Sequence, residues 1–201
     1  MPHGLFRGPG GTVTLPDPQT IMIDRRDGGQ LVVHPPRRVW DRTALAAAEL
    51  TQWSMLVAAT AGAMLDTLPQ LEGGCVNYWD AGNWALNAAA PPAGAKSGPA
   101  HRVLHLHVIG RSPRAADPSW AWGESPVYPR FADRFTWSAG KQPLSADECG
   151  VLAARLAHLL VERYGVEATV SSACARCQYP TPPGDLGVDG ACPDCSGGPA
   201  S

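Results

Sequence analysis

Two histidines, His105 and His107, lie two residues apart in an apolar stretch that runs from residue 102 to residue 111. Alternation of histidine with leucine and valine predicts a β-strand, on which residues two apart share a face. A neutral imidazole is a good nucleophile near pH 7, and a neighbouring imidazole can stabilise charge on a phosphate group. The pair therefore indicates chemistry at phosphorus, with a metal site or a hydrogen-bonded pair without chemistry as alternatives.

A metal site of the kind found on the strands of cupin-like barrels needs a glutamate soon after the two histidines and another histidine on a distant strand. Arg111 stands where that glutamate would be, and the only later histidine, His158, falls inside a predicted helix. Nucleophilic catalysis is therefore the favoured interpretation.

The stretch from Val103 to Ile109 resembles the motif of the histidine-triad (HIT) superfamily, His-φ-His-φ-His-φ-φ, in which φ is an apolar residue. By this resemblance His105 matches the nucleophilic histidine and His107 the phosphate-side one, while Val103 replaces the first histidine. The segment 31–39 is similar to the family's strand that ends in Pro-Lys-Lys/Arg-His, with Arg38 in place of the final histidine.

The resemblance implies a nucleotide hydrolase or nucleotidyl transferase that works through a nucleotidyl-histidine intermediate. Its substrate would be a dinucleoside polyphosphate or a nucleoside phosphoramidate. Two alternatives stay open: a catalytically weak nucleotide-binding or scaffold protein, and a transferase similar to hexose-1-phosphate uridylyltransferases. The resemblance also implies that a homodimer can form.

Residues that could bind a nucleotide are polar or charged and flank the predicted histidine strand. Amides and a carboxylate surround the turn at Gly82, a long loop over 88–100 offers a cation and a hydroxyl, and Arg111 ends the strand. The resemblance further implies that an early aspartate could hold ribose hydroxyls. These candidates are Asp24, Asn77, Asp80, Asn83, Asn87, Lys96, Ser97 and Arg111, with Asp27 as an alternative to Asp24.

The elements that would position these residues favour an α+β fold, an antiparallel sheet of about five strands with two main helices. Helices are predicted over 41–68 and over 145–164, where a Ser-x-x-Glu capping box and a following glycine mark the two ends. Strands are predicted over 12–15, 74–80, 102–111 and 166–170, and as a hairpin formed by 21–24 and 30–34 around an Asp-Gly turn.

The segment 112–137 is rich in aromatic residues and broken by prolines. Trp120 and Trp122 could wall a pocket for a base or leaving group, but irregular packing over the sheet is the favoured interpretation.

Four cysteines near the end of the chain form two Cys-x-x-Cys pairs separated by fourteen residues. Four thiolates in this spacing suit tetrahedral zinc and predict a zinc ribbon, with Cys174, Cys177, Cys192 and Cys195 as ligands. Residues 174–201 contain one Arg and three Asp, a balance that disfavours binding to nucleic acid. The ribbon is therefore interpreted as a structural or protein-contact module.

Bulk composition is that of an ordinary globular chain, with a formal net charge of -2 over 201 residues. The predicted organisation is a flexible lead-in (1–11), a HIT-like catalytic domain (12–171, including an extension over 112–171) and a zinc-ribbon-like tail (172–201). No apolar run of membrane-spanning length occurs and the first residues lack a signal sequence, so a cytoplasmic location is expected.

Overall fold

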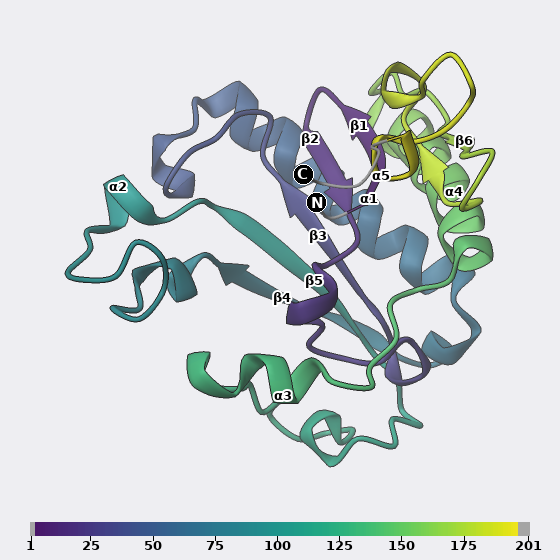
Figure 1. Ribbon diagram of the computed structural model, residues 1–201. Coiled ribbons are helices and arrows are strands. Elements are labelled where there is room, and N and C mark those ends of the chain that lie inside the picture. Colours follow the sequence, from purple (N-terminus) through teal and green to yellow (C-terminus); the bar gives the residue numbers. More distant parts are fainter. Residues whose placement is uncertain (1–2, 197–201) are drawn as a thin grey trace.

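The computed structural model describes residues 3–196, which form a mixed α/β fold around a five-stranded antiparallel sheet (Figure 1). The strand order is β1-β2-β3-β5-β4, and every neighbouring pair is antiparallel. The strands are β1 (Gly4–Gly8), β2 (Gly11–Thr14), β3 (Gln30–His34), β4 (Cys75–Ala81) and β5 (His105–Arg111). The predicted antiparallel sheet of about five strands is confirmed.

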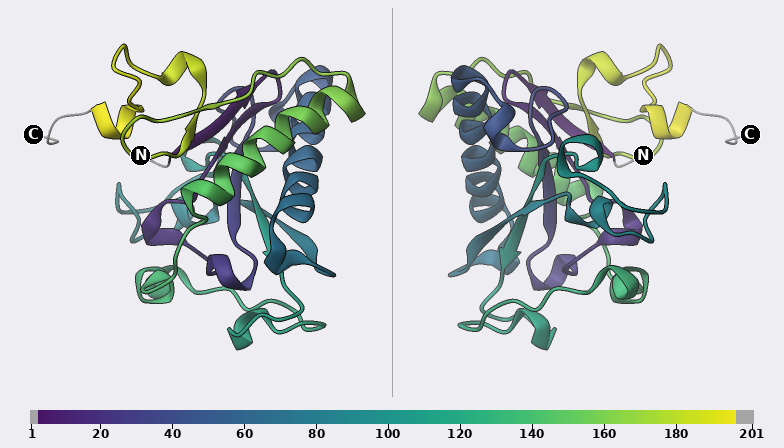
Figure 2. Two further views of the ribbon diagram at one scale, coloured as in Figure 1. Left: turned by 90° about the vertical axis from the view of Figure 1, so that its right-hand side faces the viewer. Right: turned by 90° about the vertical axis from the view of Figure 1, so that its left-hand side faces the viewer.

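Two long helices, α1 (Ala47–Thr67) and α4 (Ala146–Tyr164), lie side by side against one face of the sheet (Figures 1 and 2). They bury the apolar side chains that alternate with the histidines on the strands, so the main core lies between the helices and this face. Three shorter helices are α2 (Gly98–His101), α3 (Arg134–Ser138) and α5 (Pro193–Ser196). None of the helices in residues 3–196 is long and apolar enough to cross a membrane.

Helix α4 begins and ends as its sequence predicts. The Ser145 side chain accepts a hydrogen bond from the Glu148 backbone N–H, and Glu148 accepts one from Ser145 in return. Gly165 adopts a left-handed conformation with φ 63°, which ends the helix. Local capping signals therefore determined both ends.

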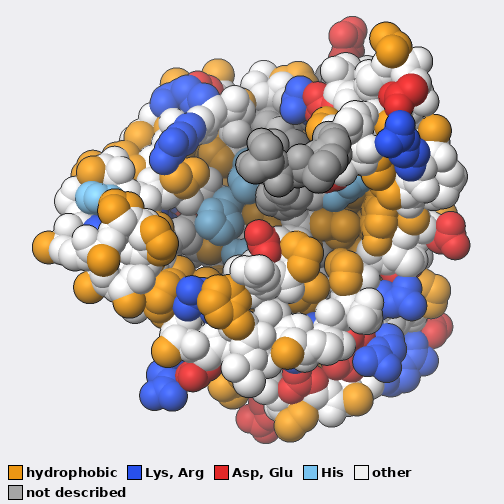
Figure 3. Space-filling view, viewed as in Figure 1, with side chains coloured by type: hydrophobic (Ala, Val, Ile, Leu, Met, Phe, Trp, Pro, Cys, Tyr) orange, Lys and Arg blue, Asp and Glu red, His pale blue; other side chains and the backbone are white. Residues whose placement is uncertain are grey.

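The opposite face of the sheet is divided into two parts. At one end the segment 112–143 covers it, and Met22, Ile23, Ile109 and Trp120 form a second buried cluster there. At the other end the side chains of His105 and His107 border a pocket. Figure 3 shows histidine side chains at the surface near the middle of this face.

The prediction of a flexible lead-in is wrong for residues 4–11. Strand β1 pairs with β2, and Leu5 and Phe6 are fully buried. The Gly- and Pro-rich composition reflects the tight turn between the two strands, where Gly11 has a φ of 124°. The strand over 12–15 is confirmed within one residue.

The predicted hairpin over 21–34 is also wrong, although its second strand exists as β3. Asp24 does not continue a strand: its carboxylate accepts a hydrogen bond from the Arg26 N–H and caps a 3-10 helix, Arg25–Asp27. Strand β3 then pairs with β2 and β5 instead of pairing with residues 21–24. A local capping interaction thus replaced the expected β-turn.

The strand predicted over 166–170 is absent from the described residues, and Val170 is 52% exposed. The chain instead forms a two-stranded sheet further on, β6 (Ser172–Ala173) with β7 (Pro180–Thr181). We call residues 172–196 the cysteine tail. It lies beside β1 at one end of the molecule (Figure 1).

Candidate functional site

Three imidazoles lie together on the sheet face that α1 and α4 leave uncovered. His105 and His107 share this face of β5, as their spacing predicts, and their ring centroids are 5.0 Å apart. His34 at the end of β3 adds a third ring, 5.9 Å from that of His105. The pairing of Val33 with Leu106 places His34 and His105 next to each other across the two neighbouring strands. The HIT-like motif does not identify His34, because its position depends on the register of β3 against β5.

A pocket of about 250 Å³ opens beside His105 and His107. Its walls are mainly apolar, and two indoles, Trp79 and Trp84, line it. Trp79 lies opposite His107 across the β4–β5 pair and stacks on its ring, with centroids 5.2 Å apart and planes inclined by 25°. The remaining lining residues are Thr20, Met22, Ala81, Gly82, Asn83, Ala85 and Val103.

The hydrogen bond of His105 determines which of its nitrogens is free. The Nδ1 atom lies 3.0 Å from the Val103 carbonyl oxygen. Because a carbonyl oxygen can only accept, Nδ1 must carry the proton, and Nε2 of the neutral ring then has a lone pair. Burial lowers the pKa of His105, although the Val103 carbonyl and Asp80 oppose this effect. The ring is therefore neutral at pH 7, as a nucleophile requires.

The other two imidazoles are also held neutral. Burial and, to a smaller extent, the neighbouring His105 lower the pKa of His107 to about 3 and that of His34 to about 4. His34 Nε2 lies 3.3 Å from the Thr14 hydroxyl, and His107 Nδ1 lies 2.6 Å from the amide nitrogen of Gln30. Both rings are thus fixed by side chains from neighbouring strands.

The buried histidines predict a loss of stability in mild acid. In the unfolded chain a histidine has a pKa of about 6.5, so below that pH the unfolded state binds protons that native His34 and His107 do not bind. The free energy of unfolding should therefore fall as the pH drops from 6.5 towards 4, by about 1.4 kcal/mol per pH unit for each such group. Urea unfolding at several pH values measures this slope.

The matched variants for this test are His34→Asn and His158→Asn. The first removes one of the buried imidazoles and should flatten the slope, while the second replaces a histidine that is exposed on α4 and controls for the loss of a histidine as such. Equal slopes in wild type and His34→Asn would contradict the prediction.

Of the eight predicted binding residues, Asn83 lines the pocket. It begins a short 3-10 helix, Asn83–Leu86, immediately after Gly82. Gly82 has a φ of 118°, and a Cβ there would lie 2.8 Å from the Val103 carbonyl oxygen. Only glycine allows the chain to turn so close to the carbonyl that holds His105.

The described structure places the other seven outside the pocket, where their groups serve internal contacts. Arg111 is buried, and its guanidinium donates to Asn77 Oδ1 at 3.1 Å and to the carbonyl oxygens of Ala121 at 2.8 Å and Glu124 at 3.1 Å. Asp80 pairs with Arg42 at 2.6 Å. These contacts fix the 120–124 loop and the edge strand β4.

The loop and turn candidates are similarly engaged. Lys96 Nζ donates to the carbonyl oxygens of Asn87 and Ala90 at 2.8 and 2.5 Å, and Ser97 is the N-cap residue of α2. The Asp24 carboxylate accepts from the backbone N–H groups of Arg26 and Gln142 at 3.0 and 2.9 Å. The alternative, Asp27, accepts at 2.7 Å from the N–H of Ala116.

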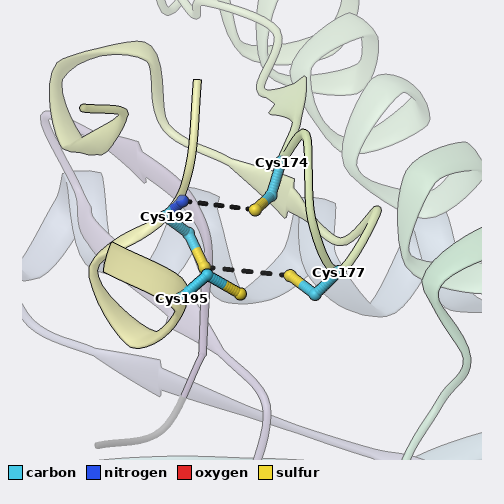
Figure 4. Close-up of side chains that lie close together, drawn as sticks. All are labelled: Cys174, Cys177, Cys192 and Cys195. Atoms are coloured by element: carbon cyan, nitrogen blue, oxygen red, sulfur yellow. Dashed lines mark hydrogen bonds between the residues drawn. The ribbon is translucent and has the colours of Figure 1, made fainter. Parts of the chain in front are cut away.

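The four predicted cysteine ligands meet in the cysteine tail and could hold a metal ion (Figure 4). Their sulfur atoms all lie within 4.8 Å of one another. Cys174 Sγ accepts backbone hydrogen bonds from Cys192 at 3.2 Å and Arg176 at 3.4 Å, and Cys177 Sγ lies 3.8 Å from Cys192 Sγ. Backbone N–H groups aimed at sulfur favour the thiolate form that binds metals.

Comparison of the chain with protein-family models found no match, and comparison with curated proteins found none either. The chemistry of the pocket and of the cysteine tail is what indicates the function of this chain.

Proposed function

We propose that this protein is a nucleotide hydrolase or nucleotidyl transferase of the histidine-triad type, with His105 as its nucleophile. The observation that carries the proposal is the Nδ1 contact of His105 with the Val103 carbonyl, which leaves the Nε2 lone pair of a neutral ring available beside the pocket. In the HIT motif a histidine at position 103 would join the network that orients the nucleophile. The backbone of Val103 performs this orientation here, so the missing side chain does not exclude catalysis.

The proposed reaction has two steps. His105 Nε2 attacks the α-phosphorus, a P–N bond forms, and the bond to the leaving group breaks as that group departs with its electron pair and takes a proton from solvent. Water or another acceptor then attacks the phosphorus of the nucleotidyl-histidine and releases its proton to solvent, the P–N bond breaks with its electron pair returning to Nε2, and the neutral imidazole is restored. His107 stabilises the charge that develops on the phosphate oxygens.

The lining of the pocket favours a substrate with one phosphate group. Two indoles provide flat surfaces on which a nucleobase can stack. Among the described residues that line the pocket none is Lys or Arg, the usual partners of a polyphosphate. A nucleoside phosphoramidate therefore fits this site better than a dinucleoside polyphosphate.

An assay with both substrate classes tests the proposal. We expect the purified protein to hydrolyse a nucleoside 5′-phosphoramidate, and rapid acid-free quenching followed by peptide mass spectrometry should find the nucleotidyl group on His105. If nucleotides raise the melting temperature but neither substrate class is turned over, the protein binds nucleotides without catalysis, and the enzymatic proposal fails.

We further propose that the metal of the cysteine tail is zinc. Four cysteine sulfurs in two Cys-x-x-Cys pairs match the tetrahedral, closed coordination of structural zinc sites. A closed site has no open position for substrate, so this zinc would stabilise the tail and take no part in the reaction at His105.

A further inference from the structure

A chain of hydrogen bonds, all but one of them buried, connects the segment 112–143 to His107. The Met22 carbonyl oxygen accepts from the indole N–H groups of Trp120 and Trp137 at 3.1 and 2.9 Å. The N–H of Met22 donates to the side-chain oxygen of Gln30 at 2.8 Å. The Gln30 amide nitrogen lies 2.6 Å from His107 Nδ1. The indoles of Trp120 and Trp137 are thus connected to the His107 imidazole through the Met22 peptide and the Gln30 amide.

The chemistry of these groups determines the direction of each hydrogen bond. A backbone N–H can only donate, so the Gln30 atom that faces Met22 must be the carbonyl oxygen and the atom that faces His107 must be the NH₂ group. An NH₂ group can only donate, so His107 Nδ1 must accept and carries no proton. The proton of the neutral ring is therefore on Nε2.

The two neighbouring histidines then have opposite tautomers. His105 has its proton on Nδ1 and a lone pair on Nε2, whereas His107 has a lone pair on Nδ1 and its proton on Nε2. One ring is suited to attack phosphorus, and the other can donate a hydrogen bond to a phosphate oxygen without being charged. The neutral state of His107 agrees with its burial, since 6% of this residue is exposed.

We propose that Gln30, held by the Met22 peptide and the indoles of Trp120 and Trp137, is a positioning residue that keeps the ring proton of His107 on Nε2. This inference rests on the proposed function only in naming a substrate phosphate as the acceptor of that proton. Gln30 itself is 2% exposed and acts through His107. Through these hydrogen bonds the segment 112–143 contributes to the site without lining the pocket.

Nitrogen NMR of the full-length, ¹⁵N-labelled protein at pH 7 tests the proton position directly. We expect a protonated Nε2 and an unprotonated Nδ1 for His107, with the reverse for His105. In Gln30→Glu one carboxylate oxygen still accepts from Met22, and the other offers an acceptor to His107, so Nδ1 should become protonated while His105 is unchanged. A protonated or mixed His107 Nδ1 in the wild type, or no change in Gln30→Glu, would overturn the inference.

Kinetics provides the second measurement. Gln30→Leu removes the amide and should lower kcat about 10- to 100-fold with little change in KM, because the lost orientation matters most as charge develops on phosphate. Gln70→Leu is the matched control: its amide donates to the Arg25 carbonyl at 2.9 Å and to Glu148 at 3.1 Å, away from the histidines. A kcat for Gln30→Leu equal to that of this control would overturn the role of Gln30.

The two measurements also separate this inference from the proposed function. If no substrate is turned over, the enzymatic proposal fails, and the NMR result still decides where the His107 proton lies. If turnover is found and wild-type His107 carries its proton on Nδ1, the enzymatic proposal stands and the positioning role fails.

Discussion

Replacing His105 with alanine is expected to abolish turnover, with a fall in kcat on the order of 10⁴-fold or more, while nucleotide affinity changes little. The change removes the nucleophile but leaves the two indoles and the apolar walls of the pocket in place. Steady-state rates and calorimetric nucleotide binding measure the two quantities separately. His107→Ala should be less damaging, about 10²- to 10³-fold, because it removes only the stabilisation of developing charge.

A suitable control for both variants is His158→Ala, since this histidine is exposed on α4 on the other side of the sheet. Its rates should equal those of the wild type. Activity of His105→Ala within a few-fold of the wild type would show that the nucleophile has been wrongly assigned.

Replacing Cys174 and Cys177 together with serine is expected to remove the metal and unfold the cysteine tail. Metal analysis of the wild type should find about one zinc per chain, and that of the variant almost none. Because the binding energy of a structural zinc is also folding energy, hydrogen exchange over residues 172–196 should rise to the rate of an unstructured segment.

Cys75→Ser controls for the loss of a thiol as such, because Cys75 is exposed on β4 and lies apart from the four clustered sulfurs. It should keep the full zinc content. Full zinc occupancy in the Cys174/Cys177 double variant would mean that these cysteines are not ligands.

Features that depend on neighbouring residues could be predicted from the sequence. The alternation around His105 and His107 places both rings on one face, the Ser145 capping box begins α4, and each Cys-x-x-Cys pair brings two sulfurs together. In each case residues two or three positions apart determine the geometry, so no knowledge of the distant chain is needed.

Features that depend on long-range pairing could not be predicted. His34 lies beside the other two imidazoles because of the register of β3 against β5. Leu5 is buried because β1 is part of the sheet. Arg111 illustrates a different problem. Its charge favours a role in binding a substrate phosphate. In the structure, however, the guanidinium donates its hydrogen bonds to backbone carbonyl oxygens of the 120–124 loop.

The position of the cysteine tail has a consequence for how copies of the protein behave towards one another. Strand β1 is an edge strand, and an uncovered edge carries unpaired backbone groups that can recruit a strand from a second molecule. The tail lies along β1, and Asp185 pairs with Arg7 of this strand at 2.8 Å. If the four cysteines hold a metal ion, its removal would therefore expose this strand edge to a second molecule, and the bound ion would limit aggregation as well as stabilise the tail.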